Sequence, residues 1–190
     1  EQAGKLGSKK ARKKIKELRI ALFGKISKKS CETYNKKDKK NYFNIAQCIA
    51  RNFLDGNASS YYLMAFDNGN SGAYLLAAQR MLKAQNIDLM PLAKRIPDFR
   101  SKANKSQKEK FIKLINNYGY DESFCGKVVK KNRFSKETQS NGNNAACALA
   151  AEAGDQVAST KVYEWWKNGT NGFPKKIKYA ERLLNKLEVN

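Results

Sequence analysis

Ala65-Phe-Asp-Asn-Gly69-Asn70-Ser-Gly-Ala73 is matched later in the chain by Ala150-Ala-Glu-Ala-Gly154-Asp155-Gln-Val-Ala158. In both stretches a small residue precedes Gly by four positions, Asn or Asp follows the Gly, and Ala follows four positions after it. Gly suits the left-handed conformation that ends a helix, and Asn70 or Asp155 can cap the next helix by accepting a backbone N–H. The motif therefore predicts two helix hairpins of the kind that build α-solenoids, which usually bind partners.

The rest of the chain also has the apolar periodicity of helices, and we find no convincing strand. We expect a right-handed, all-α solenoid of antiparallel helix hairpins, with roughly nine or ten helices. The longer helices are expected over 9–23, 38–54, 58–66, 70–84, 107–117, 122–131, 145–153, 155–168 and 175–187, with short pieces at 27–35 and 88–96. Residues 133–144 are polar and predict a loop, and Pro97 is expected to end a helix. We place a basic N-terminal region at 1–100 and a second helical region at 101–190.

The chain is strongly basic, with a formal charge of +21 over 190 residues. Residues 1–40 alone hold 15 Lys and Arg against four acidic residues. Such a field attracts acidic proteins, nucleic acid or anionic surfaces. Lys outnumbers Arg, whereas recognition of phosphate and bases favours the Arg fork, so we expect an acidic protein partner before nucleic acid. The lysines expected to contact it are Lys13, Lys14, Lys39, Lys40, Lys130 and Lys131; the alternative is a merely solvated surface.

Cysteine and histidine usage restricts the chemistry further. The chain has no histidine, which excludes His-containing zinc sites and His-dependent nucleophiles. Its four cysteines fall into two sequence-local pairs, Cys31 with Cys48 and Cys125 with Cys147, and no C-x-x-C occurs. We expect two disulfides, formed in an oxidising compartment. The alternatives are four buried thiols or a site in which all four cysteines hold zinc.

Two pairs of adjacent aromatic residues, Tyr61-Tyr62 and Trp165-Trp166, are candidates for partner contact. Neighbouring residues on a helix face different ways, so one ring of each pair should pack inside while the other is more exposed. Trp and Tyr are frequent anchors in protein interfaces. The alternative for both pairs is packing between helices.

Catalysis finds little support in the sequence. The closest acidic pairs, Glu152 with Asp155 and Asp121 with Glu122, are expected at turns and helix ends, where carboxylates stabilise the helix dipole. There is no Gly-rich phosphate loop. We expect no catalytic residue, no cofactor and no metal.

The C-terminal stretch resembles a Sel-like repeat, a relative of the tetratricopeptide repeat. Ala150, Gly154 and Ala158 match the first turn of that repeat, Trp165 or Trp166 with Gly169 matches the second, and Gly172-Phe-Pro-Lys-Lys-Ile-Lys-Tyr-Ala180 resembles the following loop and helix. Lys176 stands where the family usually has Asp, and Tyr179 where it usually has Lys. The resemblance implies an adaptor; bacterial members occur in the envelope and in secretion or host-interaction systems, and some are disulfide-stapled.

The sequence therefore favours a non-enzymatic adaptor or scaffold of the bacterial envelope or a secretion system, periplasmic or secreted after removal of a signal peptide before Glu1. The alternative is that Glu1 is a truncation boundary and not a mature N-terminus. No run of about 18 uncharged apolar residues is present, so we expect no transmembrane helix. One alternative is a basic nucleic-acid-binding protein, and another is an immunity-type inhibitor of a toxin. A third class, an enzyme acting on cell-wall sugar, would need a buried Glu at the base of a cleft.

Overall fold

A computed structural model describes residues 26–84, 88–125 and 136–185 of the chain. Over these ranges the protein is helical and has no strand, which confirms the predicted all-α class. The chain divides into two compact units, 1–65 and 66–190, so position 100 lies within the second unit. None of the described helices is both long enough and apolar enough to cross a bilayer.

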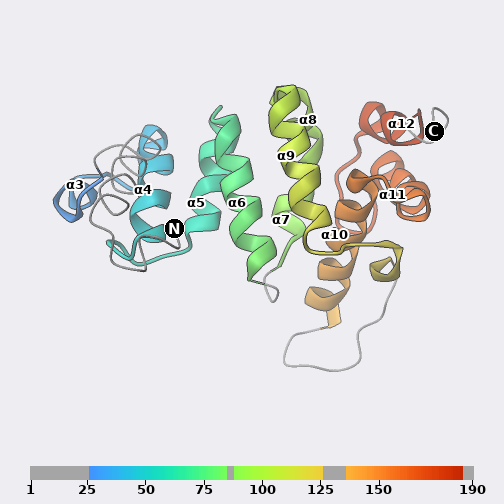
Figure 1. Ribbon diagram of the computed structural model, residues 1–190, viewed down its shortest axis with the longest axis horizontal. Helices are drawn as coiled ribbons and strands as arrows, with labels where there is room; N and C mark the ends of the chain where they lie inside the picture. The colour runs from blue at the N-terminus through green and yellow to red at the C-terminus, as the bar shows by residue number, and fades with distance from the viewer. Residues whose placement is uncertain (1–25, 85–87, 126–135, 186–190) are drawn as a thin grey trace, which may run out of the picture. The chain divides into compact units, whose positions relative to one another are not determined.

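The first unit contains α3 (Lys28–Glu32), η1 (Lys39–Asn41), α4 (Tyr42–Ala50) and α5 (Ala58–Asp67), which crosses into the second unit (Figure 1). The helix predicted over 38–54 is thus a 3-10 turn followed by a shorter α-helix. The α-helix ends where Asn52 takes a positive φ of 60°, a conformation that a helix cannot contain.

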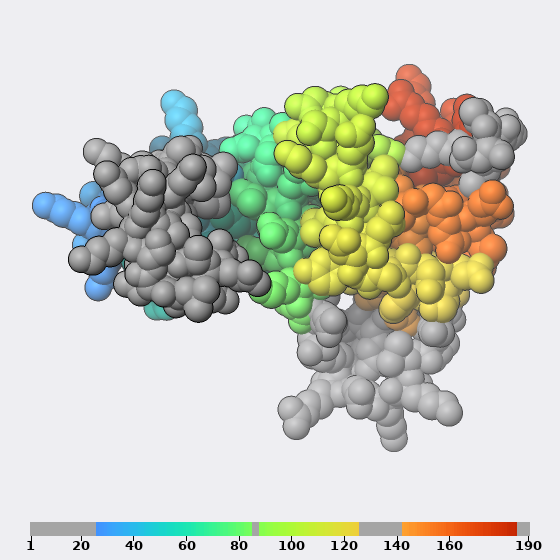
Figure 2. Space-filling model, viewed as in Figure 1, coloured from blue at the N-terminus to red at the C-terminus, as the bar shows by residue number. Residues whose placement is uncertain are grey.

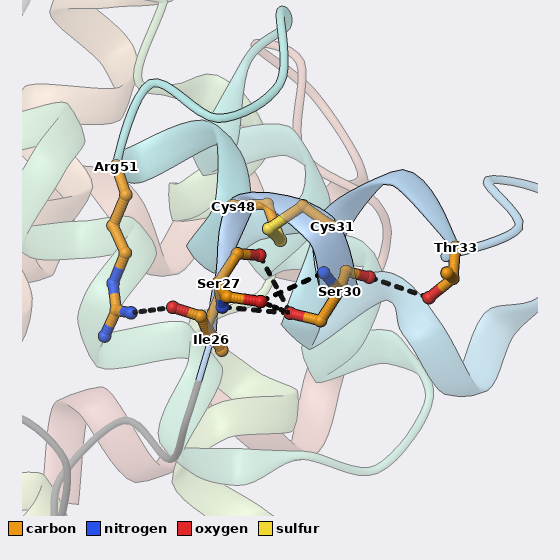
Figure 3. Close-up of a disulfide and its surroundings, with 7 residues drawn as sticks. All are labelled: Ile26, Ser27, Ser30, Cys31, Thr33, Cys48 and Arg51. Carbon is orange, nitrogen blue, oxygen red and sulfur yellow. Dashed lines mark hydrogen bonds between the residues drawn. A yellow bond between two sulfur atoms is a disulfide. The ribbon is translucent and has the colours of Figure 1, made fainter.

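A disulfide between Cys31 and Cys48 joins α3 to α4 (Figure 3), as predicted. Both cysteines are buried. A helix of five residues such as α3 is too short to be stable alone, because helix nucleation is unfavourable. A capping box between Ser27 and Ser30 supports it, and the Arg51 guanidinium donates a hydrogen bond of 3.1 Å to the Ile26 carbonyl just before it.

The second unit continues with α6 (Ser71–Lys83), α7 (Met90–Ala93), α8 (Ile96–Lys102), α9 (Lys105–Asn116), η2 (Glu122–Phe124), α10 (Lys136–Ala153), α11 (Gln156–Asn168) and α12 (Ile177–Asn185). The predicted disulfide between Cys125 and Cys147 links the end of η2 to α10. In Figure 1, α11 lies beside α10 and α12 follows next to α11.

Both copies of the turn motif take the predicted conformation. Gly69 and Gly154 have φ angles of 100° and 107°. The Asn70 side chain accepts a hydrogen bond from the Ala73 N–H at 3.2 Å, and Asp155 accepts one from the Ala158 N–H at 2.9 Å. At the second turn the Ser159 hydroxyl of α11 donates a hydrogen bond of 3.3 Å to the Ala151 carbonyl of α10. The two helices therefore approach closely enough for a side chain of one to reach the backbone of the other.

Three further local predictions are wrong. The helix predicted over 122–131 is only the 3-10 turn η2 in its described part, and Cys125 after that turn is extended. The polar stretch 133–144 is not a loop throughout, since α10 begins at Lys136 and runs without a break through Ser140–Asn144. Adding a turn to an existing helix costs much less than nucleating one, so the buried residues from Asn144 onward can carry a polar extension. Pro97 does not end a helix but lies in the first turn of α8, where its missing N–H would have had no partner.

Aromatic side chains fill the centre of the second unit. The rings of Tyr74 and Phe99 stack with centroids 4.3 Å apart, and Phe111 meets both rings edge-on. The Tyr74 hydroxyl is buried and donates to the Leu92 carbonyl at 3.1 Å. This cluster ties α6, α8 and α9 together and so fixes the helices on which the site described next is built.

Candidate functional site: a basic pocket

A cavity of about 300 Å³ opens in the second unit. It is lined by six residues from four helices, which we call the basic pocket: Arg100 of α8, Lys108 of α9, Glu152 of α10, and Tyr179, Arg182 and Leu183 of α12. Figure 2 shows the surfaces of α8 and α12 next to each other in the upper part of the view. The two segments are also joined by an ion pair between Lys176 and Asp98, at 3.5 Å.

Glu152 is a completely buried carboxylate in this lining, with a side-chain exposure of 0 %. It sits near the end of an Ala-rich stretch, residues 145–151, in which every residue is buried. Small side chains let the neighbouring helices approach α10 from all sides, so a charge on that helix is removed from water. A charge in such a place needs partners.

The carboxylate of Glu152 has partners on both oxygens. Arg100 forms an ion pair with Oε1 through its Nε, and the Tyr179 hydroxyl donates a hydrogen bond of 2.8 Å to Oε2. The Arg100 side chain is itself largely buried, at 17 % exposure. Removing one member of such a pair leaves the other as an uncompensated buried charge, so the two residues hold each other in place.

Burial raises the pKa of Tyr179 well above its ordinary value, and the nearby charge of Glu152 raises it further. Burial likewise raises the pKa of Tyr74, with Glu152 again the second cause. The phenol of Tyr179 therefore keeps its proton over the whole physiological range and acts as a donor to Glu152.

The charges of the described lining residues do not balance. Among these residues three cations, Arg100, Lys108 and Arg182, stand against one carboxylate, that of Glu152. Lys108 is half-buried and Arg182 is exposed, whereas Arg100 is largely buried beside Glu152. An arrangement of this kind attracts and orients an anion.

The aromatic residues predicted to contact a partner are not among the described residues that line the basic pocket. Trp166 is fully buried and its ring meets Tyr179 edge-on at 5.2 Å, so it supports one wall of the basic pocket from behind. Trp165 is half-buried and stacks on Phe173 with centroids 6.0 Å apart. In the first unit Tyr62 is buried and Tyr61 half-buried. Each pair thus has one inner and one more exposed ring, as expected.

Of the predicted lysines, Lys39 and Lys40 are exposed in η1. Lys13, Lys14, Lys130 and Lys131 lie outside the described residues. Within the described ranges, no group of three or more side chains is placed to hold a metal ion. The four cysteines are all in disulfides.

Sequence reasoning missed the role of Glu152, which was expected to lie at a helix end and stabilise the dipole. Its neighbour Asp155 does behave in that way, capping α11 and also accepting a hydrogen bond from the Glu122 N–H at 2.9 Å. The available signal was the run of small apolar residues around Glu152, which predicts a helix buried on all sides. Its partners Arg100 and Tyr179 carry no such signal.

No protein-family model, no curated protein and no solved structure matches this chain.

Proposed function

We propose that this chain is a non-enzymatic binding protein that takes an acidic segment of another protein into the basic pocket. The observation that carries the proposal is the convergence of Arg100, Lys108 and Arg182 on one cavity. The wider surface, with a formal charge of +21, would speed the encounter with an acidic partner, and the pocket would fix its position.

A binding role fits the chemistry of the pocket better than catalysis does. A general acid or base needs a carboxylate that is free to exchange a proton with a substrate. The Glu152 carboxylate is instead engaged by Arg100 on one oxygen and by Tyr179 on the other. In this role Glu152 holds Arg100 in position and does not react.

The repeated hairpin turn supports the finer part of the proposal, a right-handed solenoid of Sel-like type that presents its pocket rigidly. The two disulfides fit an oxidising compartment, and we place the protein in the periplasm or among secreted proteins of a bacterium, as an adaptor or scaffold of the envelope or of a secretion system.

The test compares two double variants of the full chain. Lys108→Gln/Arg182→Gln removes two pocket cations, whereas Arg80→Gln/Lys110→Gln removes one Arg and one Lys that are exposed outside the pocket. Affinity for a Glu-rich peptide, measured by calorimetry, should fall at least about tenfold for the pocket variant, a loss of about 1.4 kcal/mol, and much less for the control.

Equal losses in the two double variants would show that only net charge matters, and the pocket would be excluded as the site. Duplex DNA is the second probe in the same experiment. If DNA binds much more tightly than the peptide, with the steep salt dependence of counterion release, the nucleic-acid alternative replaces the proposal.

A further inference from the structure

The described lining residues of the basic pocket have a charge excess of two, and this excess constrains what can occupy the pocket. Of the three cations, Arg100 is neutralised by its pairing with Glu152. Lys108 and Arg182 line the same cavity with no carboxylate to balance them among its described lining residues. Like charges that share a small cavity repel each other, so an occupant with two negative charges would relieve the most unfavourable energy.

The size of the pocket requires those two charges to be close together. At about 300 Å³ it lies at the lower end of the range for ligand pockets. Two carboxylates on an extended acidic peptide belong to different residues and spread their charge along the chain. A phosphate monoester instead carries about 1.5 to 2 negative charges at neutral pH on one tetrahedral group with three acceptor oxygens.

Arg100 adds hydrogen-bond donors with a fixed direction, because its guanidinium group is planar. The nitrogen that its ion pair with Glu152 records is Nε, and the Arg100 side chain, at 17 % exposure, also lines the basic pocket. The guanidinium fork suits two oxygens of a phosphate. Glu152 is then a positioning residue, which holds the guanidinium at the buried end while its terminal nitrogens serve the ligand. The Tyr179 ring and Leu183 complete the lining with carbon.

We propose that the basic pocket binds a phosphate monoester, held by Arg100, Lys108 and Arg182, with an apolar carrier group against Leu183 and Tyr179. This inference rests on the proposed function, since it specifies the acidic group that the same pocket takes. The group can come from a phosphorylated side chain of a protein partner or from a phosphorylated small molecule.

A comparison of phenyl phosphate with phenyl sulfate tests the effect of ligand charge at constant shape. Both are tetrahedral oxyanions on the same ring, but the sulfate carries a single negative charge. Calorimetry on the full chain should give at least about tenfold tighter binding of phenyl phosphate, which corresponds to about 1.4 kcal/mol. The Lys108→Gln/Arg182→Gln variant should lose this preference, and Arg80→Gln/Lys110→Gln should keep it. Equal affinities for the two probes, or no binding of either, would overturn the inference.

A conservative variant distinguishes a loss of phosphate binding from a loss of folding. Arg182→Lys keeps the charge at an exposed position and loses the fork, so it should bind phenyl phosphate several-fold more weakly than the wild type and still prefer it to phenyl sulfate. Binding of phenyl phosphate unchanged by both Arg182→Lys and the double variant would place the phosphate outside the pocket and overturn the inference.

Two further probes identify the source of the phosphate. Tighter binding of a phosphoserine peptide than of glucose 6-phosphate would assign a protein partner, and the reverse order would assign a small molecule. If the Glu-rich peptide binds through the pocket while phenyl phosphate shows no advantage over phenyl sulfate, the proposed function stands and only the phosphate assignment fails.

Discussion

At the scale of single residues, Glu152 and its two partners explain how a buried charge can be stable in a helical core. An isolated buried carboxylate would cost several kcal/mol. Arg100 compensates the charge and Tyr179 supplies a hydrogen bond of 2.8 Å. Each of the three residues therefore depends on the others. Tyr179 allows the smallest change, because replacing it by Phe removes only the hydroxyl.

Tyr179→Phe tests that dependence through pH. Burial and the charge of Glu152 raise the pKa of Tyr179 in the folded protein above its value of about 10 in the unfolded chain. Below about pH 10 both states hold the proton and the stabilising contribution is complete. As the pH rises further, the unfolded chain releases the proton first, so the free energy of unfolding falls by up to about 1.4 kcal/mol per pH unit for this group.

We expect Tyr179→Phe to lower the free energy of unfolding by about 1 to 2 kcal/mol at neutral pH, because one Glu152 oxygen loses its donor. The variant should also show a shallower alkaline decline than the wild type, although Tyr74 still contributes to it. Urea unfolding at about pH 8 and at about pH 11 measures both effects. Tyr61→Phe, at a half-buried ring in the first unit, is the control, and a decline as shallow in it as in Tyr179→Phe would contradict the assignment.

At the scale of elements, the short helix α3 depends on its disulfide. Its five residues include Cys31, and its other supports are the Ser27–Ser30 capping box and the hydrogen bond from Arg51 to Ile26. Cys31 and Cys48 are separated by 17 residues, and closing a loop of that order contributes about 3 kcal/mol. By contrast, α11 has 13 residues, an Asp155 cap and a Gly169 end in the left-handed conformation.

Cys31→Ala/Cys48→Ala should therefore release α3 and leave α11 intact. We expect the amides of 28–32 to exchange with solvent almost as fast as in an unfolded chain, because a helix of this length has no independent stability. Hydrogen exchange followed by mass spectrometry makes the measurement, and the amides of 156–168 are the internal control. Retained protection of α3 in the variant would mean that packing alone holds it.

At the scale of the whole molecule, charge opposes compactness. A chain of 190 residues with a formal charge of +21 repels itself most when folded, where its lysines are held close together. The described ion pairs are few against this excess, and those outside the basic pocket, such as Arg95 with Asp67 at 2.7 Å, are partly exposed. Screening should therefore favour the folded state.

Sodium chloride should raise the urea midpoint of the protein as the Debye length shortens from about 30 Å at 0.01 M to about 8 Å at 0.15 M. A variant in which Lys36, Lys37, Lys39 and Lys40, all exposed, are replaced by Gln should respond less steeply. The readout is the shift of the urea midpoint with salt at constant slope. A midpoint that falls with salt would show that attractive ion pairs outweigh the repulsion.

The sequence by itself determined the features that depend on neighbouring residues. The glycines at 69 and 154, the caps at Asn70 and Asp155, the all-helical class and the two cysteine pairs follow from conformational preference, hydrogen bonding over a few positions and short loop closure. It failed at 136–144 and at Pro97, where the packed helix around the segment outweighed its local preference.

Only the tertiary structure determined which residues meet in the basic pocket. Arg100, Glu152 and Tyr179 are far apart in the chain and belong to three different helices. Whether the carboxylate at 152 is solvated at a turn or enclosed beside Arg100 depends on which helices cover α10. Burial and the pairing of charges are properties of packed neighbours, so they cannot be derived from the spacing of residues along one helix.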